Sequence, residues 1–230
     1  MPLNSPSLIR FRGPHAGYVA LAFVVLFCAG LYPVTMFGGM PYYPPPTASV
    51  AEMVAFFSTR QTAVLLCAFL QFGAAILLGI YVATVVSQLH FLGVRAAGTS
   101  IALYGGLATA IGIVFGNSYL WAMSYSDISR DPTLLHALYR ISFGIGGPGF
   151  SVPFGIFIAG IAVTAGLTRL IPRWLMWFGI AIAICGELSW FEMLSTRFLP
   201  LIPLTRFPGF LWSILVGFKL PRTAPIGRIA

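Results

Sequence analysis

The chain has 230 residues, of which 58% are hydrophobic and only 8% are charged, and its formal net charge is +8 at pH 7. An ordinary soluble domain contains about 25% charged residues, so this composition excludes that class. The basic residues lie between apolar stretches rather than along one face, which argues for membrane topology and against nucleic acid as a partner.

Four stretches contain no Asp, Glu, Lys or Arg: residues 13–51, 61–94, 96–126 and 141–168. Each can hold a helix of about 20 residues, the length that crosses a hydrocarbon layer of roughly 30 Å. The sequence therefore predicts an all-α, polytopic transmembrane bundle, with residues 1–230 as one transmembrane domain in contact with membrane lipids. We expect six crossings, at roughly 17–37, 61–86, 99–123, 146–168, 172–193 and 198–220.

The first apolar run, residues 17–37, follows Arg10 and Arg12 as a signal peptide would. The run is longer than the ~7–15 residues of a signal core and no small-residue cleavage site follows it, so we expect an uncleaved first crossing. Ser49 and Glu52 have capping-box spacing. They predict a short helix that leads through Arg60 into the second crossing.

In the third crossing small residues recur every four positions, which favours close helix packing; they are Ala108, Gly112 and Gly116. Asp131 and Pro132 then predict a polar turn and a short amphipathic helix. Glycines and prolines crowd residues 144–153, so the fourth crossing either breaks there or begins there. Non-helical backbone at membrane depth requires protein or a watery cavity beside it, and broken helices line many transporter sites.

The last crossing is the least regular. Only 12 residues separate Arg206 from Lys219. A sixth crossing must therefore carry Pro200, Pro203 and Arg206 within it, or else the chain crosses five times.

With six crossings, one side receives eight basic residues and the other five, which predicts cytoplasmic termini. The cytoplasmic set is Arg10, Arg12, Arg95, Arg169, Arg173, Lys219, Arg222 and Arg228; the outer set is Arg60, Arg130, Arg140, Arg197 and Arg206.

Glu187 is the most suspicious ionisable residue, because it lies about 22 Å along the fifth crossing and below the outer surface. Its expected partners are Arg206, Arg140 and Arg60. Glu192 follows about 140° around the helix, which disfavours a paired-carboxylate site. These five residues form the candidate ligand-binding set, and the alternative is a purely structural ion pair.

Other polar residues point to helix contacts rather than chemistry. Gln71 and Asn117 lie inside crossings and are expected to hydrogen-bond to neighbouring helices, with a binding role as the alternative. The three histidines and three cysteines show no metal-ligand spacing. We therefore expect no metal and no cofactor.

The second half resembles a group of uncharacterised bacterial multi-pass membrane proteins that carry a domain of unknown function. The resemblance lies in Ile171-Pro172-Arg173-Trp174-Leu175 with Gly179, in Pro208-Gly209-Phe210-Leu211-Trp212, and in Gly217-Phe218-Lys219-Leu220. It implies a small helical bundle in a bacterial plasma membrane and transfers no catalytic residue.

Three functions remain open from the sequence. The first is a non-enzymatic carrier of a small ligand or an accessory subunit of a membrane complex, with protein partners unknown. The second is an intramembrane enzyme that acts on a lipid or quinone with Glu187 as acid/base. The third is a purely structural membrane component.

Overall fold

The computed structural model describes residues 8–225, and most of them are helical. The elements are β1 (Leu8–Arg10), α1 (Ala16–Leu31), the 3₁₀ turns η1 (Tyr32–Val34) and η2 (Met36–Gly38), α2 (Val50–Thr59), α3 (Gln61–Phe91), α4 (Ala97–Ala122), α5 (Ser126–Ser129), α6 (Pro132–Gly146), α7 (Pro148–Leu167), α8 (Arg173–Leu188), η3 (Ser189–Met193), η4 (Thr196–Phe198), α9 (Leu201–Lys219) and β2 (Thr223–Pro225).

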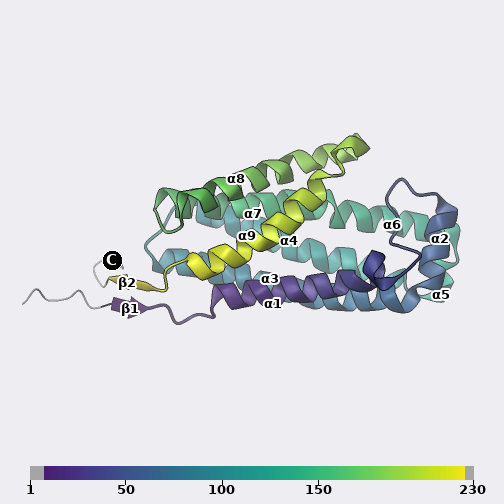
Figure 1. Ribbon diagram of the computed structural model, residues 1–230, viewed down its shortest axis with the longest axis horizontal. Helices are drawn as coiled ribbons and strands as arrows, with labels where there is room; N and C mark the ends of the chain where they lie inside the picture. The colour runs from purple at the N-terminus through teal and green to yellow at the C-terminus, as the bar shows by residue number, and fades with distance from the viewer. Residues whose placement is uncertain (1–7, 226–230) are drawn as a thin grey trace, which may run out of the picture.

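Within residues 8–225, six helical segments are long and apolar enough to cross a membrane, which confirms the predicted six-span bundle (Figure 1). They are Ala16–Val34, Gln61–Phe91, Ala97–Ala122, Pro132–Leu167, Arg173–Met193 and Thr196–Lys219. The sixth carries Arg206 inside α9, together with Pro203 and Pro208, and so the count does not fall to five.

The fourth segment begins earlier than residue 146, where the sequence placed its start. Asp131 caps α6, its Oδ1 accepting from the amides of Thr133 (2.9 Å) and Leu134 (3.0 Å), and Pro132 occupies the first turn. The predicted short amphipathic helix is therefore the first part of the same crossing. Gly147 then interrupts the rod between α6 and α7, so the fourth crossing is broken rather than started at the glycine–proline stretch.

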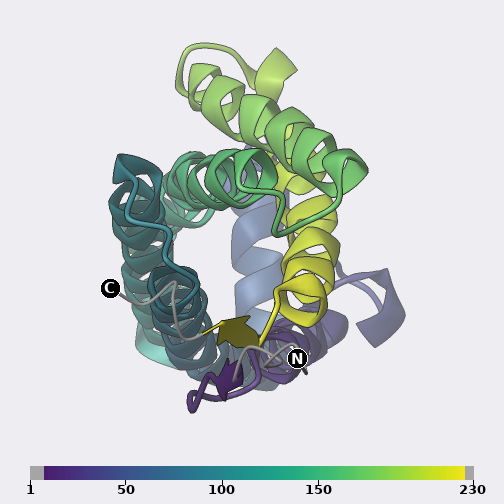
Figure 2. The same cartoon turned by 90° about the vertical axis from the view of Figure 1, so that its left-hand side faces the viewer.

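Five helices form a ring in which each packs on its neighbours, in the order α1, α3, α4, α7, α9 and back to α1. Helix α8 lies outside this ring against α7 and α9 (Figure 2). Buried aromatic side chains fill part of the interior, among them Phe23, Phe150, Phe154, Phe157 and Phe210. Such contacts hold helices together where lipid offers no hydrophobic driving force.

Close approach of α4 to α7 depends on small residues. A Cβ at Gly105 would lie 2.6 Å from the Pro153 carbonyl oxygen, and one at Gly160 would lie 2.6 Å from the Gly98 carbonyl oxygen. The predicted stripe faces the same region, because a Cβ at Gly112 would lie 3.4 Å from the Gly149 oxygen and one at Gly116 would lie 3.5 Å from Ile145. Gly116 thus lies opposite the end of α6, which begins to contact it at ordinary van der Waals distance.

The two described ends of the chain lie at one end of the bundle. Strands β1 and β2 pair antiparallel, with Ile9 opposite Ala224. Gln88 of α3 donates to the carbonyls of Leu220 (3.2 Å) and Pro221 (2.9 Å), which fixes the exit from α9. Arg228 lies outside the described residues.

The opposite end is closed by α2, α5 and the start of α6 (Figure 1). The predicted capping box opens α2: Ser49 N donates to Glu52 Oε2 (2.8 Å), and Glu52 N donates to Ser49 Oγ (3.3 Å). Apolar residues of α2 and α6 form a second core here, which includes Phe56, Phe57 and Tyr139. The sequence assigns this end to the outer side, and that assignment stays a prediction.

Candidate functional site

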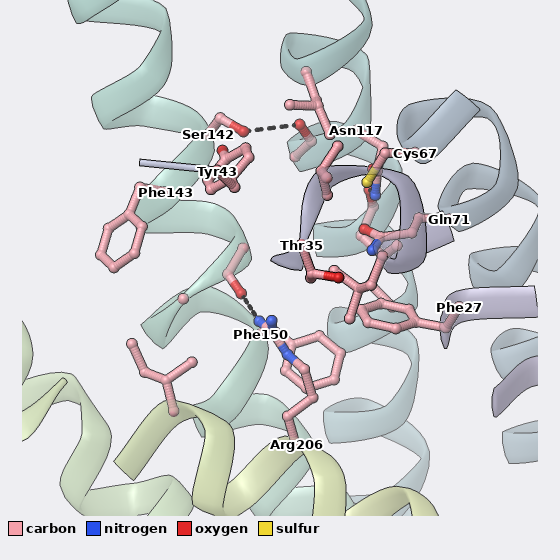
Figure 3. A pocket seen from close by; sticks show the side chains of 18 residues that line it. Phe27, Thr35, Tyr43, Cys67, Gln71, Asn117, Ser142, Phe143, Phe150 and Arg206 are labelled. Atoms are coloured by element: carbon pink, nitrogen blue, oxygen red, sulfur yellow. Dashed lines mark hydrogen bonds between the residues drawn. The ribbon is translucent and has the colours of Figure 1, made fainter. Parts of the chain in front are cut away.

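A cavity of about 310 Å³ lies inside the bundle beside the break in the fourth crossing. This volume falls at the lower end of the roughly 300–1,000 Å³ usual for small-molecule sites. The lining comes from α1, α3, α4, α6, α7, α9 and the segment after α1, and comprises Phe27, Leu31, Val34, Thr35, Tyr43, Cys67, Gln71, Ile113, Gly116, Asn117, Leu120, Ser142, Phe143, Gly146, Gly147, Phe150, Ile202 and Arg206 (Figure 3).

The helix break changes which backbone groups are available at the cavity. Phe150 N donates to the Gly147 carbonyl (3.2 Å), so the Gly146 carbonyl loses the amide that would pair with it in a continuous helix. Gly147 is required here because a Cβ would lie 2.8 Å from the Phe143 carbonyl oxygen and 3.1 Å from Ile202. A free carbonyl at the C-terminal end of α6 attracts positive charge.

Arg206 supplies that charge from α9. Its Nη2 donates to the Gly146 carbonyl, as the dashed line in Figure 3 marks. Its Cζ lies 4.6 Å from the ring centre of Phe150 and 5.7 Å from that of Phe27, which are cation–π distances. The guanidinium is therefore held by a carbonyl and two aromatic rings, and its Nε is buried without a hydrogen-bond partner among the described residues.

Three other polar side chains of the lining have their donors occupied. Ser142 Oγ donates to the Gly116 carbonyl (3.1 Å), Asn117 Nδ2 to the Ile113 carbonyl (2.8 Å) and Thr35 Oγ1 to the Tyr32 carbonyl (3.1 Å). These donors therefore bond to backbone carbonyls of the protein.

Gln71 differs from these three. It is only 7% exposed, and its Nε2 has no hydrogen-bond partner among residues 8–225. Gln71 and Arg206, which both line the cavity, thus each carry one unpaired buried nitrogen. A buried donor without a partner costs about 1–3 kcal/mol.

Tyr43 approaches the cavity from the segment between η2 and α2. Burial, and to a lesser extent Tyr139 and Cys67, raise the pKa of the Tyr43 phenol well above its ordinary value, while Arg206 acts in the opposite direction. The phenol therefore stays protonated at neutral pH. None of the lining residues is Asp or Glu. The cavity wall is therefore mostly apolar side chains with one positive charge and several hydrogen-bond donors.

The structure does not gather the predicted ligand-binding set in one place, and only Arg206 lines the cavity. Arg60 Nη2 donates to the carbonyls of Pro33 (2.8 Å) and Gly38 (2.6 Å) and thereby holds η1 and η2. Arg140 is exposed on α6 and donates from Nε to His136 Nε2 (3.2 Å).

The two glutamates lie on the α8 side. Glu187 is exposed in the last turn of α8, where its Oε1 lies against Gly155 of α7, 3.2 Å from where a Cβ would be. Glu192 is half-buried in η3. The pairing of Glu187 with Arg206, Arg140 or Arg60 is not formed, because these arginines donate to carbonyls or to a histidine instead.

Sequence reasoning noticed Gln71 and Asn117 but assigned both to helix contacts. Neither donor bonds to a neighbouring helix: that of Asn117 bonds to Ile113 within α4, and Gln71 Nε2 remains unpaired. The roles of Tyr43 and Phe150 were missed. The glycine–proline stretch was the available signal for Phe150, since this residue lies within residues 144–153.

Comparison with known proteins found no matching family model, curated protein or solved structure. The resemblance to uncharacterised bacterial membrane proteins therefore stays a prediction.

Proposed function

We propose that this multi-pass membrane protein is a carrier that binds a small amphipathic ligand in the cavity beside Gly147. The observation that supports the proposal is the break in a membrane crossing with Arg206 held at the freed Gly146 carbonyl. Irregular backbone at membrane depth is characteristic of transporter sites, where it lines the binding cavity.

The arrangement of polar groups favours binding over acid/base chemistry. The lining carries an arginine and amide and hydroxyl groups but no carboxylate, and Glu187 is not among its residues. The enzyme hypothesis, which relied on Glu187 as acid/base, gains no support from the cavity. An accessory subunit that binds the same ligand without moving it is the second candidate, since the cavity would serve either role.

The distribution of basic residues supports an orientation of this carrier with both ends of the chain in the cytoplasm, and the resemblance of the second half supports a bacterial plasma membrane. The cavity would then lie in the outer half of the bilayer, at the end of the bundle closed by α2.

Cys67 provides the experiment, because it lines the cavity and is buried. A variant with Cys28→Ser and Cys185→Ser leaves it as the single thiol of the chain. A carrier exposes its site to each side in turn, so a membrane-impermeant thiol reagent is expected to modify Cys67 from either side of sealed vesicles.

A second single-thiol variant, which retains only the exposed Cys28, controls for reagent that enters through lipid. Modification of Cys67 from one side only would replace the carrier by a binding subunit. If Cys67 reacted from neither side of the vesicles, and reacted no differently in a cavity-filling Gly116→Leu variant, the proposed ligand cavity would be wrong.

A further inference from the structure

The charge and donor pattern of the cavity restricts the ligand beyond its size. Arg206 brings a guanidinium into the bundle, and no acidic residue lines the same space. A charge at membrane depth is costly unless it is paired, and an intramembrane arginine normally pairs with an acidic side chain or with backbone carbonyls. Here the partners are the Gly146 carbonyl and two aromatic rings, none of which carries a formal negative charge.

Two residues that line the cavity, from different helices, each carry an unpaired buried donor. Nε of Arg206 comes from α9 and Nε2 of Gln71 from α3, and both are buried without a partner among the described residues. Figure 3 shows the two side chains on the cavity wall together with Thr35 and Phe150. Donors of this kind match acceptor oxygens, and a hydrogen bond between a guanidinium and an ionised oxygen is roughly twice as strong as a neutral one.

Most of the other lining residues are apolar, and they include Phe27, Ile113, Leu120, Phe143 and Ile202. A ligand that fits must therefore combine one anionic group with an apolar body. One cation suits a singly charged carboxylate better than a phosphate dianion, whereas a neutral quinone carbonyl would leave the charge of Arg206 uncompensated.

We propose that the cavity takes a monocarboxylate with an apolar chain or ring, whose oxygens accept from Arg206 and Gln71. This inference rests on the proposed function, because it names the chemical class of the ligand for the same cavity. The carboxylate has two possible sources, a water-soluble acid or a fatty acid from the bilayer. A lipid-facing groove lined by Phe69, Ile76 and Trp121 shares Asn117 with the cavity. A fatty acid from the bilayer would therefore need to pass only Asn117 to enter the cavity.

The test is isothermal titration of the full chain in phosphatidylcholine nanodiscs with octanoate, 1-octanol and palmitate, against empty nanodiscs. Octanoate is expected to bind about tenfold or more tightly than 1-octanol, because only the anion makes charge-assisted hydrogen bonds. Palmitate that binds while octanoate does not would support the same carboxylate site with the bilayer as its source.

Variants assign the preference to residues. Arg206→Gln is expected to abolish the difference between octanoate and 1-octanol, whereas Arg140→Gln, which removes an exposed arginine with a histidine partner, leaves it intact. Because Arg206→Gln can also weaken the fold, Gln71→Leu serves as the second variant, and we expect it to reduce octanoate affinity several-fold while the bundle stays folded.

The outcomes separate the two proposals. Equal affinity for octanoate and 1-octanol, with both lost in Gly116→Leu, would overturn the carboxylate inference and leave the ligand cavity standing. Retention of the octanoate preference in both Arg206→Gln and Gln71→Leu would also overturn the inference. If none of the three compounds bound, the cavity itself would fail as a ligand site.

Discussion

The guanidinium of Arg206 donates to the carbonyl of Gly146, which lies 60 residues earlier in the chain and ends α6. One bond thus joins the fourth crossing at its break to the sixth crossing. The same bond satisfies two groups that each need a polar contact inside a membrane, namely a carbonyl without its helical partner and a buried cation. The energetics of the cavity depend on this contact.

The aromatic support of Arg206 can be measured by comparing Phe150→Leu with Phe154→Leu. Both phenylalanines are buried on α7, and their rings pack on each other and on Phe210. Only Phe150 lies under the guanidinium, at 4.6 Å. We expect Phe150→Leu to lower the free energy of unfolding by about 1–2 kcal/mol more than Phe154→Leu does. Equal losses in a mixed-micelle unfolding experiment would show that the cation–π contact contributes nothing.

Gln71 and Gln88 form a matched pair on α3 for a test of buried amide groups. Nε2 of Gln71 is unpaired, whereas that of Gln88 donates to the Leu220 and Pro221 carbonyls. Gln71→Leu is expected to raise the free energy of unfolding by about 1 kcal/mol, and Gln88→Leu to lower it by about 1–3 kcal/mol. Thermal unfolding in detergent, without added ligand, measures both. Destabilisation by Gln71→Leu would mean that this side chain has a structural role.

The crossings could be predicted from the sequence because long uncharged runs have no stable place outside lipid. The break near Gly147 could also be anticipated, since Pro148 and Pro153 cannot donate backbone hydrogen bonds. The partners of Arg206 could not. Depth along a helix suggested Glu187, but depth does not say which way a side chain points, and the Glu187 carboxylate lies against Gly155 of α7 rather than in the cavity. The freed carbonyl of Gly146 became the partner instead.

The capping box of α2 predicts a pH dependence at the α2 end of the bundle. Hydrogen bonds from the backbone and side chain of Ser49 lower the pKa of Glu52 from its ordinary value of 4.5. A depressed folded-state pKa stabilises the helix above pH 4.5, and this contribution is lost as the pH falls through the lower folded value. The protection of the α2 amides against hydrogen exchange, measured relative to the intrinsic exchange rate at each pH, is therefore expected to fall below about pH 4.5. Glu52→Gln, which keeps the capping geometry, is the control and should show no such pH dependence; an identical pH profile in both proteins would contradict the assignment.

Gly147 and Gly144 allow a test of the break itself, because one glycine is required by contacts and the other is not. An alanine Cβ at 147 would lie 2.8 Å from the Phe143 carbonyl oxygen, whereas one at 144 would meet no atom within 4 Å. We expect Gly147→Ala to lower the free energy of unfolding by about 1–3 kcal/mol through overpacking. Gly144→Ala should raise the free energy of unfolding by up to about 1 kcal/mol, because alanine is a better helix former than glycine. In the variant that retains Cys67 as its single thiol, Gly147→Ala should also change the rate at which the thiol reagent modifies Cys67, because the displaced helix end borders the cavity. If Gly147→Ala matched Gly144→Ala in stability and in Cys67 reactivity, the fourth crossing would tolerate a side chain at the break, and the close contact between Gly147 and Phe143 would not define the cavity.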